Sequence, residues 1–242
     1  MTDFSRYSRQ VVLPEVGVNG QAVLRDSSVL VFGLGGLGSA ATQYLAGAGI
    51  GQLMIVDRDR VDHSNLQRQT LYRQADVGQL KTLAAAAQLG ALNPQIEIQH
   101  FDAEAGLAAV RHADVVLDCT DNFPARYAIN AACVQARKPL VSGAAIRFEG
   151  QFAVFDLRRG GPCYRCLFAD VGEPAERCED AGILGPVVAT VGSLQALAAL
   201  KLLLGIDAGA GRLHSWDALQ MQWRSLRFSA DPSCPECGNA HA

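Results

Sequence analysis

The 242-residue sequence has little charge, and its charges nearly balance. Lys, Arg, Asp and Glu make up 19% of the residues, and the formal net charge is −3. A chain without a basic excess has no global positive field with which to attract nucleic acid. Hydrophobic residues, at 49%, are too many for a disordered chain. The composition therefore indicates a globular protein whose partners are small molecules or other proteins.

Long apolar runs are also scarce. Residues 1–6 contain no apolar core, so we expect no secretory signal. Only residues 185–204 are apolar over a length that could cross a membrane, and polar or helix-breaking residues such as Pro186 and Lys201 interrupt them. We expect a buried helix there, no membrane contact and a cytoplasmic location. Because no internal repeat or flexible linker is found, we expect one domain over residues 1–242.

Residues 28–68 have the order of a nucleotide-binding βαβ unit. An apolar run at 29–32 predicts a strand, an alanine-rich segment at 39–50 predicts a helix, and a second apolar run at 53–56 predicts the next strand. Between the first strand and the helix stand four glycines, and the second strand is followed at once by an acid. The pattern is therefore typical of a site for adenosine.

Each glycine of this turn has an expected task. Gly33 permits the tight turn, Gly35 lets backbone N–H groups approach a phosphate, and Gly38 lets the helix lie close to the strand. Asp57 stands where such folds place a carboxylate that binds ribose hydroxyls. The glycine pattern alone also suits NAD or FAD, and a turn without any ligand remains an alternative.

The rest of the chain predicts an α/β fold with a Rossmann-like, largely parallel sheet flanked by helices, an antiparallel C-terminal portion and a structural zinc knuckle. Strands are expected at 96–101, 113–119 and 140–142, with helices at 18–25, 77–92, 104–112 and 122–137. From Gly150 the pattern changes, and the antiparallel strands are expected at 151–157, 212–217 and 222–228.

Polar residues follow two of the predicted parallel strands. The loop over residues 57–69 is unusually polar for the carboxyl end of a strand, where open α/β sheets bind their ligands. Lys81 stands near a helix N-terminus, which is unfavourable unless an anion binds there. Asp121 and Asn122 open another helix, and helix capping alone would account for them.

Two Cys-x-x-Cys pairs stand far apart in the chain. Cys163 with Cys166, and Cys234 with Cys237, could place four thiolates on one tetrahedral ion, which describes a structural zinc site. A disulfide or a thioredoxin-like motif fits this context less well.

Three cysteines remain. Cys119 and Cys133 lie in apolar segments and are expected in the core. Cys178 lies in an acidic segment without periodicity, and as a thiol in a loop it is either incidental or a nucleophile.

Taken together, these residues resemble the MoeB/ThiF adenylyltransferases, which are bacterial relatives of ubiquitin-activating enzymes. The resemblance spans essentially the whole chain, from Arg6 to Gly238. Its motifs are Gly33-Leu34-Gly35-Gly36-Leu37-Gly38, Ser64-Asn65-Leu66-Gln67-Arg68-Gln69, Lys81, Asp118-Cys119-Thr120-Asp121-Asn122 and the two cysteine pairs.

The resemblance implies an activity. ATP would adenylate the C-terminal glycine of a small ubiquitin-fold sulfur-carrier protein that ends in Gly-Gly, with release of pyrophosphate. Residues 28–142 would form the nucleotide-binding half, and residues 150–237 the carrier-binding and zinc half.

The resemblance also implies roles for single residues. Gly33, Gly35, Gly36 and Gly38 would cradle the nucleotide, with Gly36 close to it, and Asp57 would hold the ribose. The motif beginning at Ser64 would bind nucleotide, with phosphate contacts from Asn65, Arg68 and Lys81. Asp121 would hold Mg²⁺ beside Asn122, and Arg9 would reach across a homodimer interface into the partner's site.

The chemistry agrees with these roles. A glycine carboxylate is ionised at neutral pH, so its attack on the α-phosphorus needs no general base. The sequence offers neither a histidine-based dyad nor a nucleophile elbow. The reaction needs positive charge around the triphosphate, which Arg9, Arg68, Lys81 and Mg²⁺ would supply.

The pathway of the carrier is not decided by the sequence. Residues 6–10 and 222–226 look more like the thiamine-pathway members, whereas residues 143–151 look more like the molybdopterin-pathway members. In thiamine-type enzymes a loop cysteine can bond to the carrier, and Cys178 stands at the matching place. No sulfur-transfer extension follows Ala242, so we expect a separate sulfur donor. The alternatives are activation of a small carboxylate such as a modified tRNA base, an NAD-dependent oxidoreductase and an inactive scaffold.

Overall fold

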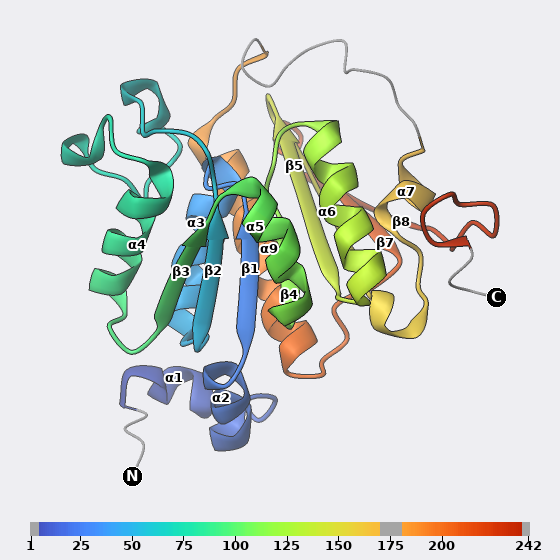
Figure 1. Ribbon diagram of the computed structural model, residues 1–242, viewed down its shortest axis with the longest axis horizontal. Helices are drawn as coiled ribbons and strands as arrows, with labels where there is room; N and C mark the ends of the chain where they lie inside the picture. Colours follow the sequence, from blue (N-terminus) through green and yellow to red (C-terminus); the bar gives the residue numbers. More distant parts are fainter. Residues whose placement is uncertain (1–4, 170–180, 239–242) are drawn as a thin grey trace.

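The computed structural model describes residues 5–169 and 181–238. Within these ranges eight strands form one sheet in the order β3-β2-β1-β4-β5-β6-β7-β8 (Figure 1). The strands are β1 (Ser28–Phe32), β2 (Gln52–Val56), β3 (Glu97–Phe101), β4 (Val115–Asp118), β5 (Leu140–Ile146), β6 (Glu149–Phe155), β7 (Arg212–Asp217) and β8 (Gln222–Arg227). The first five strands run parallel and the remaining pairs antiparallel. The predicted fold class is confirmed.

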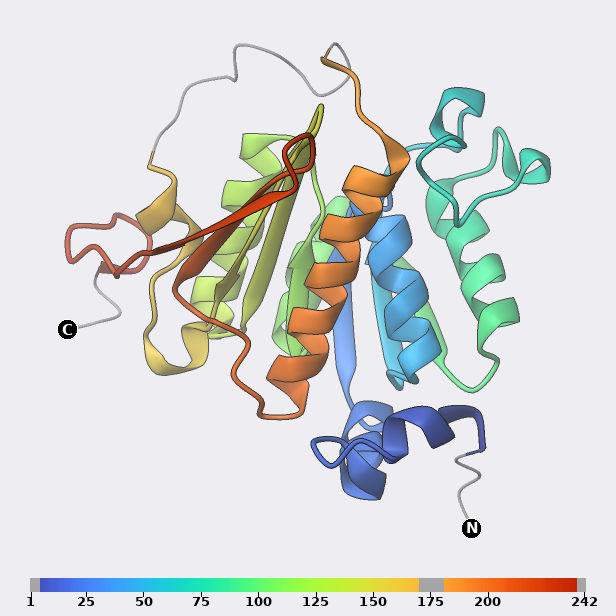
Figure 2. The same cartoon turned by 180° about the vertical axis from the view of Figure 1, so that it is seen from behind.

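The helices cover both faces of the parallel strands (Figures 1 and 2). Val29 and Val31 of β1 pack with α3, α4 and α9, whereas Leu30 and Phe32 pack with α5 and α6. The α-helices are α1 (Ser8–Val11), α2 (Gly17–Arg25), α3 (Gly36–Ala48), α4 (Lys81–Leu92), α5 (Ala103–Ala109), α6 (Phe123–Ala136), α7 (Tyr164–Leu167) and α9 (Gly185–Leu203). Short 3-10 helices are η1 (Ser5–Tyr7), η2 (His63–Asn65), η3 (Gln74–Asp76), η4 (Val110–His112) and η5 (Leu157–Arg159).

The strand order places a topological switch point at the carboxyl ends of β1 and β4. The chain passes from β1 to β2 on one side and later returns to β4 on the other, which is the switch point where open α/β sheets bind ligands. The loops that follow β1, β2 and β4 lie at this edge, which is the upper edge in Figure 1. They contain most of the predicted site residues.

The N-terminal helices α1 and α2 lie at the opposite edge, below the amino ends of the strands (Figure 1). Asn93 Nδ2 donates a hydrogen bond of 2.8 Å to the Tyr7 hydroxyl, and Arg6 Nη1 donates one of 3.1 Å to the Leu92 carbonyl oxygen. These bonds fix the arm against the end of α4.

The start of α4 differs from the prediction. The helix begins at Lys81 and not at residue 77, because residues 77–79 form a turn and a bend and Leu80 is extended against the loop after β2. Arg60 and Leu80 form an antiparallel bridge, and Lys81 N donates to the Asp59 carbonyl oxygen at 2.9 Å. Lys81 thus becomes the first residue of the helix, beside that loop.

Helix α9 is long and apolar enough to cross a membrane by length and composition alone. Half of its most apolar window is buried inside the molecule. Gly192 gives α9 its close approach to α3, because a Cβ there would lie 3.0 Å from the Leu37 carbonyl carbon. The expectation of a buried helix agrees with this packing.

Candidate active site

The glycine turn after β1 is shaped by its own close contacts. Gly33 adopts φ +87°, in the left-handed region, and a Cβ at this residue would lie 2.7 Å from the Cys119 carbonyl oxygen. A Cβ on Gly38 would collide with the Gly33 carbonyl oxygen. Both glycines therefore allow the close turn and the close helix that the sequence predicted.

Gly35 and Gly36 differ in their surroundings. A Cβ on Gly36 would lie 2.6 Å from a methyl of Val188 on α9, so this glycine is required by helix packing. Among the described residues beyond its chain neighbours, a Cβ on Gly35 would meet only the side-chain nitrogen of Gln69, at 3.8 Å. The open space at the N-terminus of α3 is therefore at Gly35, where a bound anion would meet backbone N–H groups.

Asp57 holds the glycine turn in place. Its carboxylate accepts hydrogen bonds from Leu34 N at 2.7 Å and from Asp59 N at 2.8 Å. Burial raises the pKa of Asp57, and the neighbouring Lys81 and these two bonds oppose the rise. The side chain is half-buried, so part of it remains open to a ligand.

Lys81 is buried and already has a carboxylate partner. Its ammonium nitrogen lies 3.0 Å from Asp59 Oδ2, and the side chain is 7% exposed whereas that of Asp59 is 59% exposed. The sequence analysis did not identify Asp59, since acidic residues in a polar loop are common. The cation therefore faces the acids at this strand edge.

The segment after Asp57 is ordered by its own hydrogen bonds. Asp62 caps η2 by accepting from Ser64 N at 2.8 Å, and Asn65 Oδ1 accepts from Asp62 N at 3.1 Å. Arg68 Nη1 donates to the Ser64 carbonyl oxygen at 3.0 Å. Gly185 at the start of α9 lies against this segment, because a Cβ on it would be 3.3 Å from Arg68 Cα.

Tyr72 is a site neighbour that the sequence analysis missed. Its buried hydroxyl donates a 2.9 Å hydrogen bond to the Leu34 carbonyl oxygen inside the glycine turn. Burial raises the pKa of Tyr72, so the hydroxyl keeps the proton that it donates. A lone tyrosine in a polar segment has no pattern that would have marked it.

Asp121 and Asn122 lie after β4, at the same edge. Asn122 is the N-cap of α6, accepting from Ala125 N at 3.0 Å, so the capping alternative is correct for this residue. Asp121 is exposed and accepts from Asn122 Nδ2 at 3.3 Å. An exposed carboxylate that does not cap the helix remains available to a cation.

A buried polar network lies beneath Asp121, and the sequence did not reveal it. Asp118 is 1% exposed and accepts from Thr120 N at 3.0 Å and from Ser142 Oγ at 2.7 Å. The buried Arg126 lies 3.7 Å from Asp118 and donates to the Gly143 carbonyl oxygen at 3.0 Å. From α9, Gln195 Nε2 donates to the Asp118 carbonyl oxygen at 2.8 Å. The network fixes the strand end that presents Asp121.

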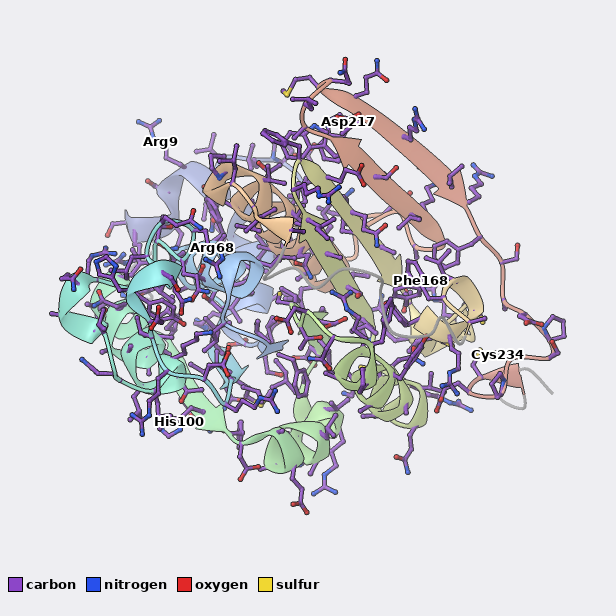
Figure 3. The ribbon with its side chains drawn as sticks, turned by 90° about the horizontal axis from the view of Figure 1, so that it is seen from above. Arg9, Arg68, His100, Phe168, Asp217 and Cys234 are labelled. Atoms are coloured by element: carbon purple, nitrogen blue, oxygen red, sulfur yellow. The ribbon has the colours of Figure 1, made fainter. Side chains whose placement is uncertain are left out.

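Arg9 lies apart from the other predicted residues. It is exposed on α1, and Figure 3 shows it pointing outward, away from Arg68. Because α1 lies at the amino ends of the strands, Arg9 is not part of the site of its own chain. Its role in the site of a second chain stays a prediction.

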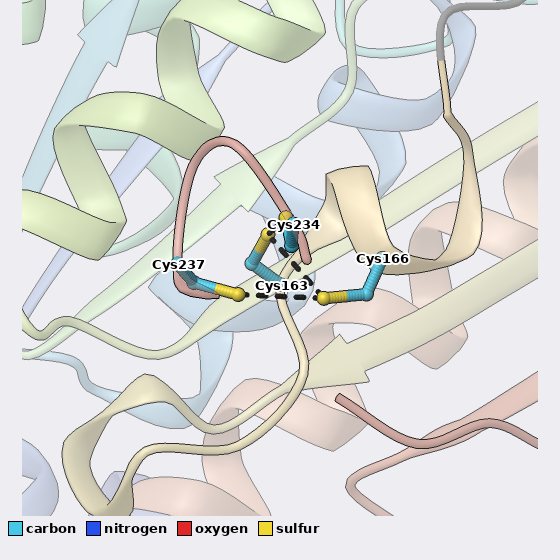
Figure 4. Close-up of side chains that lie close together, drawn as sticks. All are labelled: Cys163, Cys166, Cys234 and Cys237. Carbon is cyan, nitrogen blue, oxygen red and sulfur yellow. Dashed lines mark hydrogen bonds between the residues drawn. The ribbon is translucent and has the colours of Figure 1, made fainter. Parts of the chain in front are cut away.

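The four paired cysteines come together in space (Figure 4). The sulfur atoms of Cys163 and Cys234 are 3.7 Å apart, those of Cys163 and Cys166 are 3.9 Å apart, and those of Cys166 and Cys237 are 3.3 Å apart. Tetrahedral Zn–S bonds of about 2.3 Å separate sulfur atoms by about 3.8 Å. Asp231 N donates a hydrogen bond of 3.4 Å to Cys166 Sγ, which helps to orient this sulfur atom. Four thiolates with no open position fit a structural metal ion.

Of the three remaining cysteines, the two that the structure describes lie in the core, as expected. Cys119 and Cys133 are buried, and burial raises the pKa of both thiols. Cys178 lies outside the described residues, so its predicted link to a carrier stays a prediction.

Comparison with known proteins places these features in a family. The model of the ThiF family matches residues 7–236. The sulfur carrier protein ThiS adenylyltransferase of Escherichia coli K12 is 48% identical, with 99% of this chain and 97% of that protein covered. The molybdopterin-synthase adenylyltransferase of the same organism is also 48% identical, with 96% of each chain covered.

Solved structures agree on the fold. The crystal structure of E. coli MccB with MccA-N7isoAsn superposes with a TM-score of 0.84 at 24% identity, covering 96% of this chain and 75% of that one. At this identity the likeness concerns the fold alone. The match to the family model and the two full-length relatives together show that this chain belongs to the ThiF family.

Proposed function

We propose that this protein uses ATP to adenylate the C-terminal glycine carboxylate of a ubiquitin-fold sulfur carrier, in the biosynthesis of thiamine or molybdopterin. Two relatives at 48% identity over nearly their full length are named as adenylyltransferases of such pathways. The observation that supports the site most directly is the open N-terminus of α3 at Gly35, with Asp57, Lys81, Arg68 and Asp121 at the same sheet edge.

Different residues would bind different parts of the nucleotide. Asp57 would accept hydrogen bonds from the ribose, and the N-terminus of α3 would face the phosphates. Arg68 and Lys81 would place positive charge on the triphosphate, with Ser64 and Asn65 beside them. Asp121 would hold Mg²⁺, which supplies charge neutralisation for the departing pyrophosphate.

Lys81 can change partners at little cost. Its present partner, Asp59, is more than half exposed, so that carboxylate stays hydrated when the ammonium turns to a phosphate. The carrier's carboxylate is ionised at neutral pH and attacks the α-phosphorus without a base from the protein. The chain's contribution is therefore positioning and positive charge.

The antiparallel half offers a surface for the carrier. All six residues of β8 are exposed, and this strand forms the free edge of the sheet. Trp223 stacks on Trp216 with ring centroids 5.3 Å apart and remains half exposed. Other exposed apolar side chains of this region are Phe148, Leu219, Met221 and Leu226. An apolar patch at a strand edge is suited to docking a small protein.

Three further assignments belong to the same proposal. The cysteine cluster holds Zn²⁺, and two copies of the chain form a homodimer in which Arg9 serves the partner's site. A separate protein supplies the sulfur, because adenylation supplies none. The six described cysteines are either in the metal cluster or buried in the core.

The experiment is ATP–pyrophosphate exchange with a panel of carriers that end in Gly-Gly. Thiamine-type and molybdopterin-type carriers are added separately, each beside a variant without its last two glycines. We expect exchange that depends on one intact carrier. Exchange with a small carboxylate, or with no carrier in the panel, would argue against the proposal.

A further inference from the structure

Arg126 is a buried cation that directs its hydrogen bonds to two segments of the sheet edge. The residue is 7% exposed, and its carboxylate partner Asp118 lies 3.7 Å away. Arg126 Nη2 donates to the Thr120 carbonyl oxygen and, at 3.0 Å, to the Gly143 carbonyl oxygen. Arg126 Nη1 donates to Ser142 Oγ at 3.3 Å. One side chain thus joins the loop after β4 to β5.

Net stability does not account for this arrangement. Taking two charges out of water offsets much of their attraction, so apolar residues of similar volume are often as stable as a buried ion pair. A guanidinium differs from an apolar group because it offers several donors in one rigid plane. Arg126 therefore supplies a fixed geometry at this edge more than it supplies stability.

Thr120, the residue just before Asp121, is held from both sides. Its N and Oγ1 atoms donate to Asp118 Oδ1 at 3.0 and 2.6 Å, and its carbonyl oxygen accepts from Arg126. A Cβ on Gly33 would lie 3.2 Å from Thr120 N, so the same residue also lies against the glycine turn. The residue after Asp121 is the N-cap of α6. The exposed carboxylate of Asp121 therefore stands on a backbone that is fixed before and after it.

Tyr164 holds the guanidinium from the segment of the cysteine cluster. It is 2% exposed, lies between Cys163 and Cys166 in the chain, and borders the same small cavity as Arg126. Burial raises the pKa of Tyr164 to about 12, and Arg126 opposes the rise through its charge and a hydrogen bond to the phenolic oxygen. Tyr164 N donates to Asn130 Oδ1 on α6 at 2.8 Å, which fixes the backbone of this residue.

These contacts converge on one acid. We propose that Arg126 is a positioning residue, which holds the Thr120 peptide so that the Asp121 carboxylate meets the magnesium ion of the nucleotide, and that Tyr164 keeps the guanidinium in place. This assignment rests on the proposed function, in which Asp121 holds Mg²⁺. Arg126 acts through Asp121 and not through contact with the nucleotide, so its effect on ATP binding should depend on magnesium.

The test measures the magnesium gain, which is the ratio of the dissociation constants of ATP without and with Mg²⁺, by calorimetry. The buffer without divalent cations contains no chelator, so that any metal in the cysteine cluster stays bound. Arg126→Lys keeps a charge opposite Asp118 but loses the plane of donors. Arg137→Lys, at the exposed C-cap of the same helix, is the matched control. We expect Arg126→Lys to lower the magnesium gain on the order of tenfold and to leave ATP binding without Mg²⁺ unchanged, and Arg137→Lys to alter neither.

A double-mutant cycle shows whether the effect passes through Asp121. Asp121→Ala should lose the magnesium gain, and Arg126→Lys in that background should weaken ATP binding no further. If Arg126→Lys weakens ATP binding equally with and without Mg²⁺, or weakens it further in Asp121→Ala, then Arg126 does not position this acid.

Tyr164→Phe is a second variant that removes only a hydroxyl, in case Arg126→Lys does not fold. Tyr127→Phe is its control, because the Tyr127 hydroxyl donates to the Ala169 carbonyl oxygen at 3.1 Å. We expect a magnesium gain lower by about two- to fivefold in Tyr164→Phe and unchanged in Tyr127→Phe. An unchanged gain in either Arg126→Lys or Tyr164→Phe would overturn this proposal alone. A wild-type protein that does not bind ATP would contradict the proposed function, and this proposal with it.

Discussion

At the scale of single residues, the acid and the cation at the strand edge depend on each other. Burial raises the pKa of Asp57, and Lys81 lowers it. Asp57 also anchors the glycine turn through Leu34 N, so one carboxylate is expected both to shape the turn and to bind the ribose. Its protonation state should therefore be visible in nucleoside binding.

We predict that adenosine affinity falls on acidification, beginning above the usual carboxyl range near pH 4. A pKa that is higher in the folded state means that the folded protein holds this proton more tightly. Because of ionised Asp57, the free energy of unfolding therefore falls as pH rises through the folded pKa of this residue. On acidification, protonated Asp57 binds the ribose more weakly. Adenosine is used because it has no phosphate that titrates. Calorimetry between pH 4 and 7 should show this dependence in the wild type and a weak, flat response in Asp57→Asn; a flat wild-type curve would count against the ribose role.

The sequence indicated some residues of the site better than others. Gly33, Gly38 and Asp57 follow a local spacing, because one βαβ unit contains them all. Asp59, Tyr72, Arg126 and Gln195 belong to the site through contacts between distant segments, which no local pattern records. Asn122 was expected beside the metal-binding acid, and it is also a helix cap.

At the scale of elements, α9 fixes the position of the glycine turn. Its Val188 lies against Gly36 and its Gly185 lies against the segment of Arg68. The sequence predicted this helix from its apolar run but not its contact with the turn. The boundary of α4 was likewise wrong by four residues, since tertiary pairing at Leu80 overrode local propensity.

We predict that Gly36→Ala lowers the free energy of unfolding by about 1–3 kcal/mol, because the added methyl overpacks against Val188. Adding Val188→Ala removes both methyls of that valine but leaves its Cβ 2.9 Å from the new methyl, so it should restore part of the loss. Gly47→Ala, on the same helix but with nothing within 4 Å of the new methyl, should stabilise the protein by about 0.5–1 kcal/mol. Urea denaturation of these three variants and of the wild type measures these values. If the double variant recovered none of the lost free energy of unfolding, α9 would not be in close contact with the glycine turn.

At the scale of the whole molecule, the cysteine cluster and the proposed dimer join distant parts. The cluster ties the segment at Cys163 to the C-terminal segment at Cys234, which are 71 residues apart in the chain. The sequence predicted that these four cysteines come together, because spacing and residue type alone mark four thiolate ligands. It could not predict where Arg9 would lie, since that depends on how α1 packs below the sheet.

We predict one zinc ion per chain, and a thermal midpoint lower by on the order of 5–10 °C once a chelator removes it. Cys166→Ser should lose the metal as well. Elemental analysis and calorimetric unfolding measure the two effects. A protein that is free of zinc and melts at the same temperature with or without chelator would refute a structural zinc site.

We further predict that Arg9→Ala and Lys81→Ala, each inactive alone, restore activity when they are mixed and allowed to exchange subunits. If Arg9 serves the partner, a mixed dimer contains one complete site, so roughly a quarter of all sites should recover. Pyrophosphate exchange after mixing measures the recovery. No recovery, although exchange of subunits is verified with tagged chains, would mean that Arg9 does not act across an interface.

The central claim is that the edge formed by the glycine turn, Lys81 and Asp121 activates a nucleoside triphosphate. Its most direct test is ATP–pyrophosphate exchange by Lys81→Ala beside Lys138→Ala, whose lysine follows the C-terminal end of α6. We predict a loss on the order of 10²- to 10³-fold for Lys81→Ala and none for Lys138→Ala. Wild-type exchange in Lys81→Ala would contradict the account.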